Sequence, residues 1–245
     1  MIVLGVDTAT SHASVAIVEN GRLLTEKLPG AGAVTAARPG SSRNHHGEVL
    51  VPLIDAALKS AVLTLDDIDG YAVAIGPGSF TGLRIGLSTV KSLAYASKVT
   101  VTAVSTLHAV ASRVNGFNGI ICSLLDARKK EVYAALFRRR DAVLERLSDD
   151  VVLPCERLAE LLRGVDRSQP ILLAGDGAVV YGERLIASVG AHLGIAAEQD
   201  LMTVAAAVAF IALPDAGRTD TLPQASLEPR YLRLPEAELR AQKLG

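Results

Sequence analysis

The chain has 245 residues, of which 49% are hydrophobic and 21% charged, a composition typical of a folded globular protein with one or two domains. Its formal net charge of −1 argues against a protein that holds nucleic acid by its own electrostatics, which requires a concentrated basic face. The two cysteines, Cys122 and Cys155, lie far apart and suggest neither a disulfide framework nor a metal-binding pair. The start lacks a signal-peptide pattern, and no apolar run reaches the roughly 18 residues of a membrane span. We therefore expect a cytoplasmic protein without membrane contact.

The first half of the chain predicts three strands followed by a helix, a strand and a helix. Apolar, β-branched runs favour the strands, and Asn20-Gly21 supplies the positive φ angles of a hairpin turn between the second and third. Residues 29–43 are rich in Gly, Ala, Ser and Pro and predict a mobile loop. From Gly47 onward the apolar residues recur with helical spacing. The expected elements are strands at 2–6, 13–18 and 22–28, a helix at 47–62, a strand at 71–75, a tight turn at 76–82 and a helix at 81–97.

The second half repeats this order of elements. A second pass of the same unit predicts a duplicated α/β protein with a mixed sheet in each half. We expect a first lobe over residues 1–105, a second lobe over 106–200, and an extended tail over 214–245. A helix near 201–213 is expected to cross back to the first lobe. The expected second-half elements are strands at 119–125, 131–138 and 143–147, a helix at 154–163, a strand at 171–174 and a helix at 179–189.

Asp7 and Thr8 follow the first strand and allow two interpretations. In phosphotransfer folds with this order of elements, an acid at this point can hold Mg²⁺, and the backbone N–H groups after it can cradle a phosphate. The other interpretation is an Asx turn, in which Asp7 bonds the backbone two residues further on.

The turn over 76–86 is the sharpest local feature. Gly76 and Gly78 permit backbone angles that a Cβ would forbid, and Ser79 or Thr81 can cap the helix that follows. Such a turn is either an anion site at a helix N-terminus or a structural turn. Because it lacks the lysine of a P-loop, a Walker-type nucleotide site is excluded.

Two further patterns leave alternatives open. Gly175 and Gly177 form a second strand-to-turn glycine pair, which serves either as a worn adenosine-binding turn or as a turn alone. The basic runs 128–130 and 138–140 are either solvated strand ends and turns or RNA contacts.

Five segments, in order along the chain, resemble the TsaB family. The resemblance covers essentially the whole chain and implies a duplicated, two-lobed fold of the actin, Hsp70 and sugar-kinase kind, which is ribonuclease H-like. It further implies a non-catalytic subunit that pairs with a TsaD-type catalytic subunit for threonylcarbamoyl transfer to adenosine at position 37 of tRNA. A TsaE-type ATPase would meet the pair, and tRNA would be bound only through the complex. The segments are residues 2–10, 46–54, 76–86, 125–133 and 229–233, which read IVLGVDTAT, HGEVLVPLI, GPGSFTGLRIG, LDARKKEVY and PRYLR.

Compared with the catalytic relatives, this chain lacks some of the residues that catalysis would need. Those relatives carry a His-x-x-x-His metal site, whereas the corresponding stretch here offers only His108. We therefore expect no metal and no cofactor of its own, and a nucleotide at the partner interface is left open. The alternatives are an ATP-dependent small-molecule kinase of the same superfold, which would use Asp7 and the Gly175 turn, and a metalloprotease-like enzyme.

The helices over 47–62 and 81–97 are our expected pairing surface for the partner. The first carries leucines and the second small residues, which would allow close helix approach. The alternative is that both helices pack inside their own domain, and without the partner a homodimer could use the same face. The residues proposed for the interface are Leu50, Leu53, Ile54, Leu58, Gly86, Ser88 and Ser92.

Overall fold

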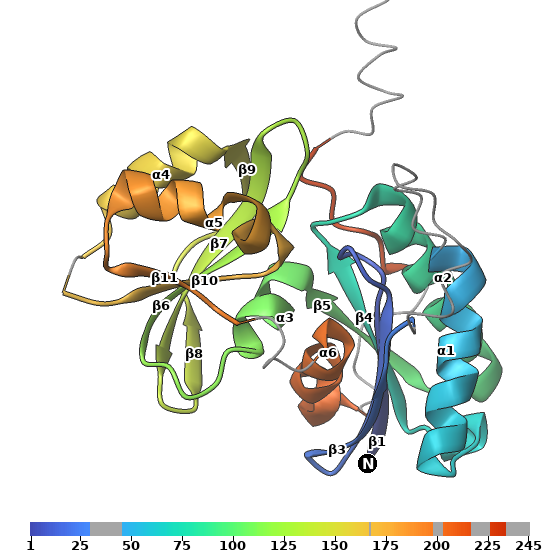
Figure 1. Ribbon diagram of the computed structural model, residues 1–245. Helices are drawn as coiled ribbons and strands as arrows, with labels where there is room; N and C mark the ends of the chain where they lie inside the picture. The colour runs from blue at the N-terminus through green and yellow to red at the C-terminus, as the bar shows by residue number, and fades with distance from the viewer. Residues whose placement is uncertain (30–45, 167, 198–202, 217–225, 234–245) are drawn as a thin grey trace, which may run out of the picture. The chain divides into compact units, whose positions relative to one another are not determined.

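The computed structural model describes residues 1–29, 46–166, 168–197, 203–216 and 226–233 (Figure 1). Two compact units divide the chain: unit 1 comprises Met1–Arg113 and Gln199–Pro229, and unit 2 comprises Val114–Glu198 and Arg230–Gly245. Nearly all of the expected mobile loop over 29–43 lies outside the described residues. Within the described part of the chain, every helix is too short or too polar to cross a membrane.

Unit 1 is built on a five-stranded mixed sheet in the order β3-β2-β1-β4-β5. The central strand β1 pairs antiparallel with β2 and parallel with β4, and β5 continues the parallel side. Every residue of β1 after Ile2 is buried, which explains its unbroken apolar run. The strands are β1 (Ile2–Asp7), β2 (Ser14–Glu19), β3 (Arg22–Lys27), β4 (Gly70–Gly76) and β5 (Thr100–Ser105).

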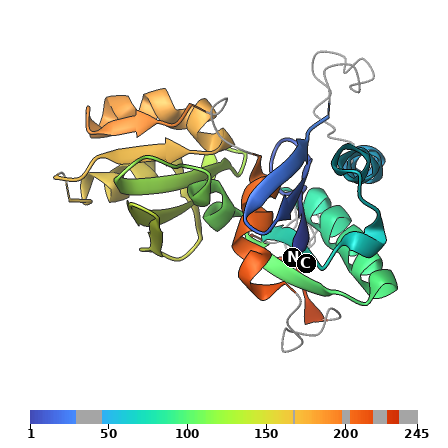
Figure 2. The same cartoon turned by 90° about the horizontal axis from the view of Figure 1, so that it is seen from below.

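Helices cover both faces of this sheet (Figure 2). One face packs against α1 (His46–Ala61) and α2 (Phe80–Ser97) through the main aliphatic core of the unit. The alanine-rich α6 (Val204–Ala212) covers the other face so closely that a Cβ on Gly5 would lie 2.3 Å from the Ala205 carbonyl oxygen. Short 3₁₀ turns at Leu65–Asp67 and Leu213–Asp215 complete the unit, with α3 (Thr106–Ser112) packed on α6.

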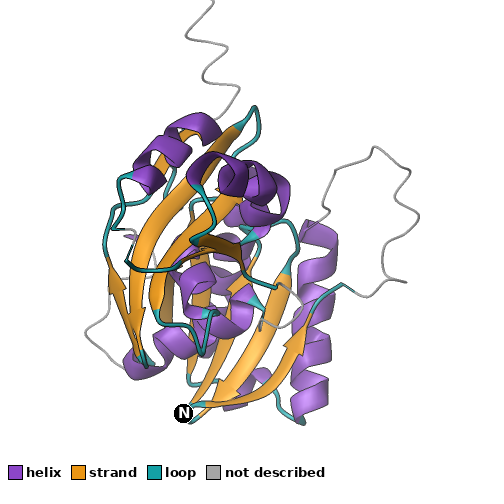
Figure 3. Ribbon diagram, turned by 60° about the vertical axis from the view of Figure 1, so that its left-hand side comes forward, coloured by secondary structure: helices purple, strands orange, loops and turns teal. Residues whose placement is uncertain are grey.

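Unit 2 repeats the arrangement with a six-stranded sheet in the order β11-β10-β6-β7-β8, in which β9 also pairs with β7. Its first strand, β6, pairs antiparallel with β7 and parallel with β10, as β1 pairs with β2 and β4 in unit 1. Two helices pack on one face of this sheet (Figure 3). The elements are β6 (Gly119–Asp126), β7 (Glu131–Arg140), β8 (Val143–Arg146), β9 (Val151–Pro154), α4 (Cys155–Arg163), β10 (Ile171–Ala174), α5 (Asp176–Val189) and β11 (Leu193–Ile195).

The matching strand orders confirm the expected α/β fold with two lobes and a mixed sheet in each. Among the α-helices and strands of the described residues, β5, α3, β9 and β11 were not expected from the sequence. They are short, with three to seven residues each, so their hydrophobic periodicity is too brief to be recognised. Helix α5 begins at Asp176 rather than at 179. Gly177, which the sequence analysis assigned to a turn before the helix, lies within the first turn of the helix.

The unit boundaries differ from the expected lobe boundaries. Unit 1 runs to Arg113 rather than to residue 105, because α3 packs on α6 and on β4 and β5. The described part of the tail is also divided: Leu227 is buried in the core of unit 1, whereas residues 230–233 belong to unit 2.

Candidate functional site

The carboxylate of Asp7 is fully buried at the end of β1, where it closes a turn of its own backbone. Its Oδ1 accepts a hydrogen bond from the Ala9 backbone N–H at 2.8 Å, and its Oδ2 accepts one from the Thr10 hydroxyl. Burial raises the pKa of Asp7 to about 6, although the hydrogen bonds from Thr10 and Ala9 and the charge of Arg113 oppose the rise. The arrangement is therefore the Asx turn, with both carboxylate oxygens engaged inside the protein.

The turn after β4 is hydrogen bonded to the turn after β1. The Ser79 backbone N–H donates to the Ala9 carbonyl at 2.8 Å, and a Cβ on Gly78 would lie 2.3 Å from the same oxygen. Gly78 also has a φ of +159°. Glycine is thus required here by the close approach of the two turns, and the Ser79 N–H is already used within the protein.

Two threonines fix the surroundings of these turns. The Thr8 hydroxyl donates to the Gly82 carbonyl at 2.7 Å, and the Gly76 backbone N–H donates to the Thr106 hydroxyl at 3.1 Å. Both threonines are fully buried. Thr106 and Arg113 are site residues that the sequence analysis missed, because both follow β5, where no element was expected.

The predicted helix cap is confirmed at Ser79. Its hydroxyl accepts from the Gly82 backbone N–H at 3.2 Å and so satisfies one of the free donors at the start of α2. One turn later, the Arg84 guanidinium lies over the Phe80 ring at 3.9 Å from the ring centroid.

The second glycine pair has a packing role in unit 2. Gly175 has a φ of +109°, and a Cβ on Gly177 would lie 2.9 Å from Leu124 Cγ and from the Leu125 carbonyl carbon. The start of α5 therefore rests directly on β6. There the Asp176 carboxylate accepts from the Asp126 backbone N–H at 3.1 Å. Close contact between helix and strand accounts for Gly177 without a bound nucleotide.

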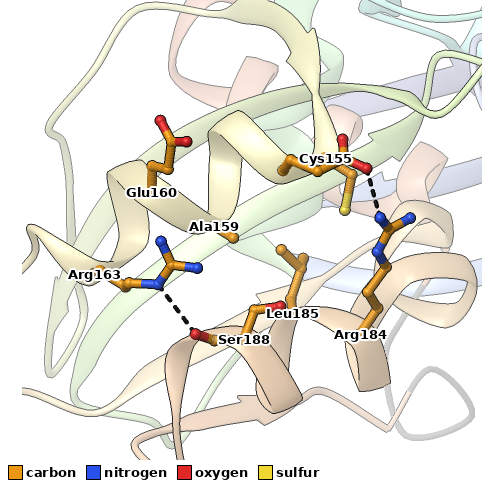
Figure 4. Close-up of a pocket in the computed structure, with 8 residues that line it drawn as sticks. Cys155, Ala159, Glu160, Arg163, Arg184, Leu185 and Ser188 are labelled. Atoms are coloured by element: carbon orange, nitrogen blue, oxygen red, sulfur yellow. Dashed lines mark hydrogen bonds and ion pairs between the residues drawn. The ribbon is translucent and has the colours of Figure 1, made fainter.

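A small pocket of about 140 Å³ lies between α4 and α5 (Figure 4). Across it, Arg184 pairs with Glu156 at 2.5 Å, and the Arg163 Nε donates to the Ser188 carbonyl at 3.1 Å. Burial raises the pKa of the Cys155 thiol, which lowers its reactivity. Ligand pockets typically measure about 300–1,000 Å³, so this one is too small for a nucleotide. Its polar residues join the two helices.

Candidate metal ligands are not clustered in the described part of the chain, where no group of three or more His, Cys, Asp and Glu side chains could hold an ion. His108 lies in the first turn of α3, and its backbone N–H donates to the capping Ser105 hydroxyl at 3.4 Å.

The proposed interface residues separate into two groups. The aliphatic residues Leu50, Leu53, Ile54 and Leu58 are each at most 8% exposed and belong to the core of unit 1. Gly86 is also buried, and a Cβ at this position would lie 2.3 Å from the Thr8 hydroxyl oxygen. Their assignment to a partner surface is corrected accordingly: the helical stripe that carries them faces the sheet of unit 1.

Ser88 and Ser92 are exposed on the outer side of α2. Each hydroxyl donates to a carbonyl of its own helix, at 3.1 Å to Ile85 and at 2.9 Å to Ser88. The exposed side of α1 and α2 also presents two large apolar side chains that the sequence analysis missed, Val51 at 61% and Tyr95 at 83% exposure. In the sequence, these two residues could have been found by their position opposite the buried apolar stripe of each helix.

Comparison with known proteins places this geometry in context. Residues 34–207 match the family model TsaD, tRNA N6-adenosine threonylcarbamoyltransferase. The chain is 26% identical to the tRNA threonylcarbamoyladenosine biosynthesis protein TsaB of Bacillus subtilis (strain 168), over 98% of this chain and 97% of that protein. It is 34% identical to the protein of the same name in Escherichia coli (strain K12), over 57% of this chain and 56% of that one.

A solved structure agrees with the sequence comparison. The crystal structure of a Pseudomonas aeruginosa protein with similarity to peptidase YeaZ superimposes with a TM-score of 0.72 at 27% identity, covering 95% of this chain and 99% of that one. The family model matches well over half of the chain, and the alignment with the B. subtilis protein runs nearly from end to end. The chain therefore belongs to the TsaD family of tRNA N6-adenosine threonylcarbamoyltransferases, and the resemblance to TsaB recognised in its motifs is confirmed.

Proposed function

We propose that this chain is a non-catalytic subunit that pairs with a TsaD-type catalytic subunit during threonylcarbamoyl transfer to adenosine in tRNA. The names of the B. subtilis and E. coli relatives support a role in this biosynthesis. The observation that carries the non-catalytic role is the interlocked pair of turns in unit 1. Both carboxylate oxygens of Asp7 are bonded within the first turn, and the backbone N–H of Ser79 joins the second turn to the first, so these groups already have partners inside the protein.

The outer side of α1 and α2 is the pairing surface that we propose. It comprises Val51, Ser88, Ser92 and Tyr95, all of which are exposed. Two large apolar side chains beside small serines allow a partner helix to approach closely and to bury both. Aromatic residues are enriched in the cores of interfaces, which makes Tyr95 the expected anchor.

Other members of the complex are part of the same proposal. A TsaE-type ATPase meets the pair, and tRNA is bound within the assembly. The chain holds no metal or cofactor of its own, and any nucleotide binds at the partner interface. Without its partner, the chain forms a homodimer through the same face.

Co-expression with the TsaD-type protein of the same cell tests this proposal. We expect the two chains to co-purify through a tag on either one, and transfer of threonylcarbamoyl to a tRNA transcript to require both. Transfer by this chain alone would overturn the non-catalytic role. Failure of the two chains to co-purify would overturn the pairing.

A further inference from the structure

The last described segment of the chain carries the motif PRYLR, residues 229–233, to which the proposed function gives no role. The segment begins inside unit 1, where Leu227 is buried in the core and its carbonyl oxygen accepts a hydrogen bond from Lys91 Nζ of α2 at 3.2 Å. From Arg230 the chain belongs to unit 2. Two residues separate Leu227 from Arg230, so even a fully extended chain spans at most about 11 Å between their Cα atoms.

The first arginine of the motif pairs with a buried acid. The side chain of Asp150, which directly precedes β9, is fully buried. Its Oδ2 lies 3.2 Å from the Arg230 guanidinium, and its Oδ1 lies 2.6 Å from the guanidinium of Arg146. A buried carboxylate is costly to ionise without partners, so each arginine matters more here than it would in an exposed ion pair. The tail therefore supplies a charge that stabilises this acid.

The second arginine binds the start of β7. The Arg233 guanidinium lies 2.6 Å from Glu131 Oε2, and the two side chains are 24% and 33% exposed. Burial raises the pKa of Tyr133 on the same strand, and the nearby charge of Arg233 opposes the rise. Arg233 is thus held against β7 rather than extended into solvent.

The spacing of the two arginines matches the spacing of the two acids. Strand β9 pairs antiparallel with β7 over four residue pairs, and Glu131 lies in the pair at one end. Asp150 directly precedes the first residue of β9, at the other end of this ladder. Three residues of extended chain advance about 10 Å, both along a strand and between Arg230 and Arg233. The motif therefore reaches both acids at once.

We propose that residues 227–233 form a strap that couples the unfolding of unit 2 to that of unit 1. Each unit has a core of its own, so each could otherwise unfold by itself. The strap ties them, because the burial of Leu227 belongs to unit 1 while the ion pairs of Arg230 and Arg233 belong to unit 2. Loss of either unit then removes contacts from the other. At its first end the strap is held by α2, the helix that carries part of the proposed pairing surface.

The hold of the ion pairs on the strap is tested with chymotrypsin, which cleaves after aromatic residues and leucine and so has sites at Tyr231 and Leu232. Arg233→Glu should raise the rate of cleavage there by about tenfold or more, because a protease cuts chain that has opened locally. Adding Glu131→Arg to Arg233→Glu should restore the wild-type rate with an identical strap sequence. The control Arg184→Glu breaks an exposed ion pair elsewhere in unit 2 and should leave the rate unchanged. Mass spectrometry identifies each cut.

The coupling of the units is tested by scanning calorimetry of the full chain. The wild type should unfold in one transition, with equal van't Hoff and calorimetric enthalpies. The variant Arg230→Gln, Arg233→Gln should lower the ratio of these enthalpies toward about one half, the value for two similar units that unfold separately. The control variant Arg157→Gln, Arg184→Gln removes two exposed ion pairs from unit 2 and should keep a single transition.

Each half of the proposal can fail in these measurements. If the double reversal is cleaved as fast as Arg233→Glu alone, the ion pair does not hold the strap, and the proposal is overturned. Two transitions in the wild type, or one transition in the variant without Arg230 and Arg233, would overturn the coupling. Circular dichroism checks beforehand that every variant folds.

Discussion

At the scale of single residues, the environment of Asp7 shows why its type does not reveal its role. An acid after the first strand suits both a Mg²⁺ site and an Asx turn, because each needs a carboxylate beside backbone N–H groups. The contacts show the Asx turn, since both oxygens bond to residues two and three positions further on. A buried carboxylate without a full charge partner is also expensive to ionise.

This cost predicts a pH dependence of stability. The pKa of Asp7 is about 6 in the folded protein against 3.8 unfolded, so the folded state binds more protons between these values. The contribution of Asp7 to the free energy of unfolding is therefore greatest below pH 4. It is lost as the pH rises through 6, and the total loss is about 3 kcal/mol. Asp7→Asn should remove this term, so urea unfolding should show the variant gaining stability relative to wild type from pH 5 to pH 8.

Asp67 is the matched control of opposite sign. Hydrogen bonds from the Thr64 backbone and hydroxyl lower the pKa of this exposed carboxyl. Its contribution to stability should be lost as the pH falls, so Asp67→Asn should lose stability relative to wild type at higher pH. A parallel response of the two variants would contradict the assignment to burial at Asp7.

At the scale of elements, α2 has two sides with different requirements. Its inner side packs so closely on the turn after β1 that Gly86 leaves no room for a Cβ beside Thr8. Its outer side carries exposed serines and Tyr95. Small residues on one helix therefore have two separate causes, internal packing and an open surface, which the sequence pattern alone does not separate.

A pair of glycine substitutions tests the inner side. Gly86→Ala should lower the free energy of unfolding by about 1–3 kcal/mol, the usual cost of overpacking. Gly47→Ala in α1 meets only Ile85 Cδ1 at 3.6 Å, an ordinary contact, and should raise stability by up to about 1 kcal/mol through helix propensity. Chemical denaturation measures both. A Gly86→Ala variant as stable as the wild type would show that α2 can move away from Thr8.

A charge on the outer side tests the pairing surface. Ser92→Arg should leave the chain folded, because Ser92 is exposed, but should abolish co-elution with the TsaD-type subunit, since burying an unpaired charge costs several kcal/mol. Each 1.4 kcal/mol weakens binding about tenfold. Ala187→Arg, at an exposed position of α5, serves as the control and should still co-elute. Size-exclusion chromatography and circular dichroism on the same samples give the answer, and co-elution of the Ser92 variant would place the interface elsewhere.

At the scale of the whole molecule, the two units repeat one topology while carrying different turns. In unit 1 the first strand ends in the Asx turn of Asp7, and in unit 2 it ends at Asp126, whose Oδ1 accepts from the Arg128 backbone N–H at 2.8 Å. Both acids thus bond to the backbone two residues further on. The shared fold therefore does not by itself establish phosphotransfer.

The isolated chain should accordingly show negligible ATP hydrolysis. Phosphate release by purified protein with Mg²⁺ and ATP is the measurement, and Asp7→Ala is the control for a contaminating ATPase. Turnover at an ordinary enzymatic rate of about 1 per second, abolished by Asp7→Ala, would favour the kinase alternative instead.

Much of the fold and of the family was determined by the sequence alone. Long periodic segments such as β1, α1 and α2 are recognisable because burial on one or both faces imposes its period on the residues. The duplicated order of elements follows from them, and extended motifs such as residues 76–86 carry the family resemblance.

The tertiary structure decided which candidate residues are accessible and what each one contacts. Leu50 and Leu53 were expected at a partner surface, but helical spacing identifies an apolar stripe without showing what covers it. The hydrogen bond between Ser79 and Ala9 joins turns about 70 residues apart, and Thr106 closes the same site from a helix too short to be recognised. The local sequence determines the secondary-structure propensity and the hydrophobic period of a segment. The solvent accessibility of a residue depends instead on contacts between distant segments, which only the folded chain brings together.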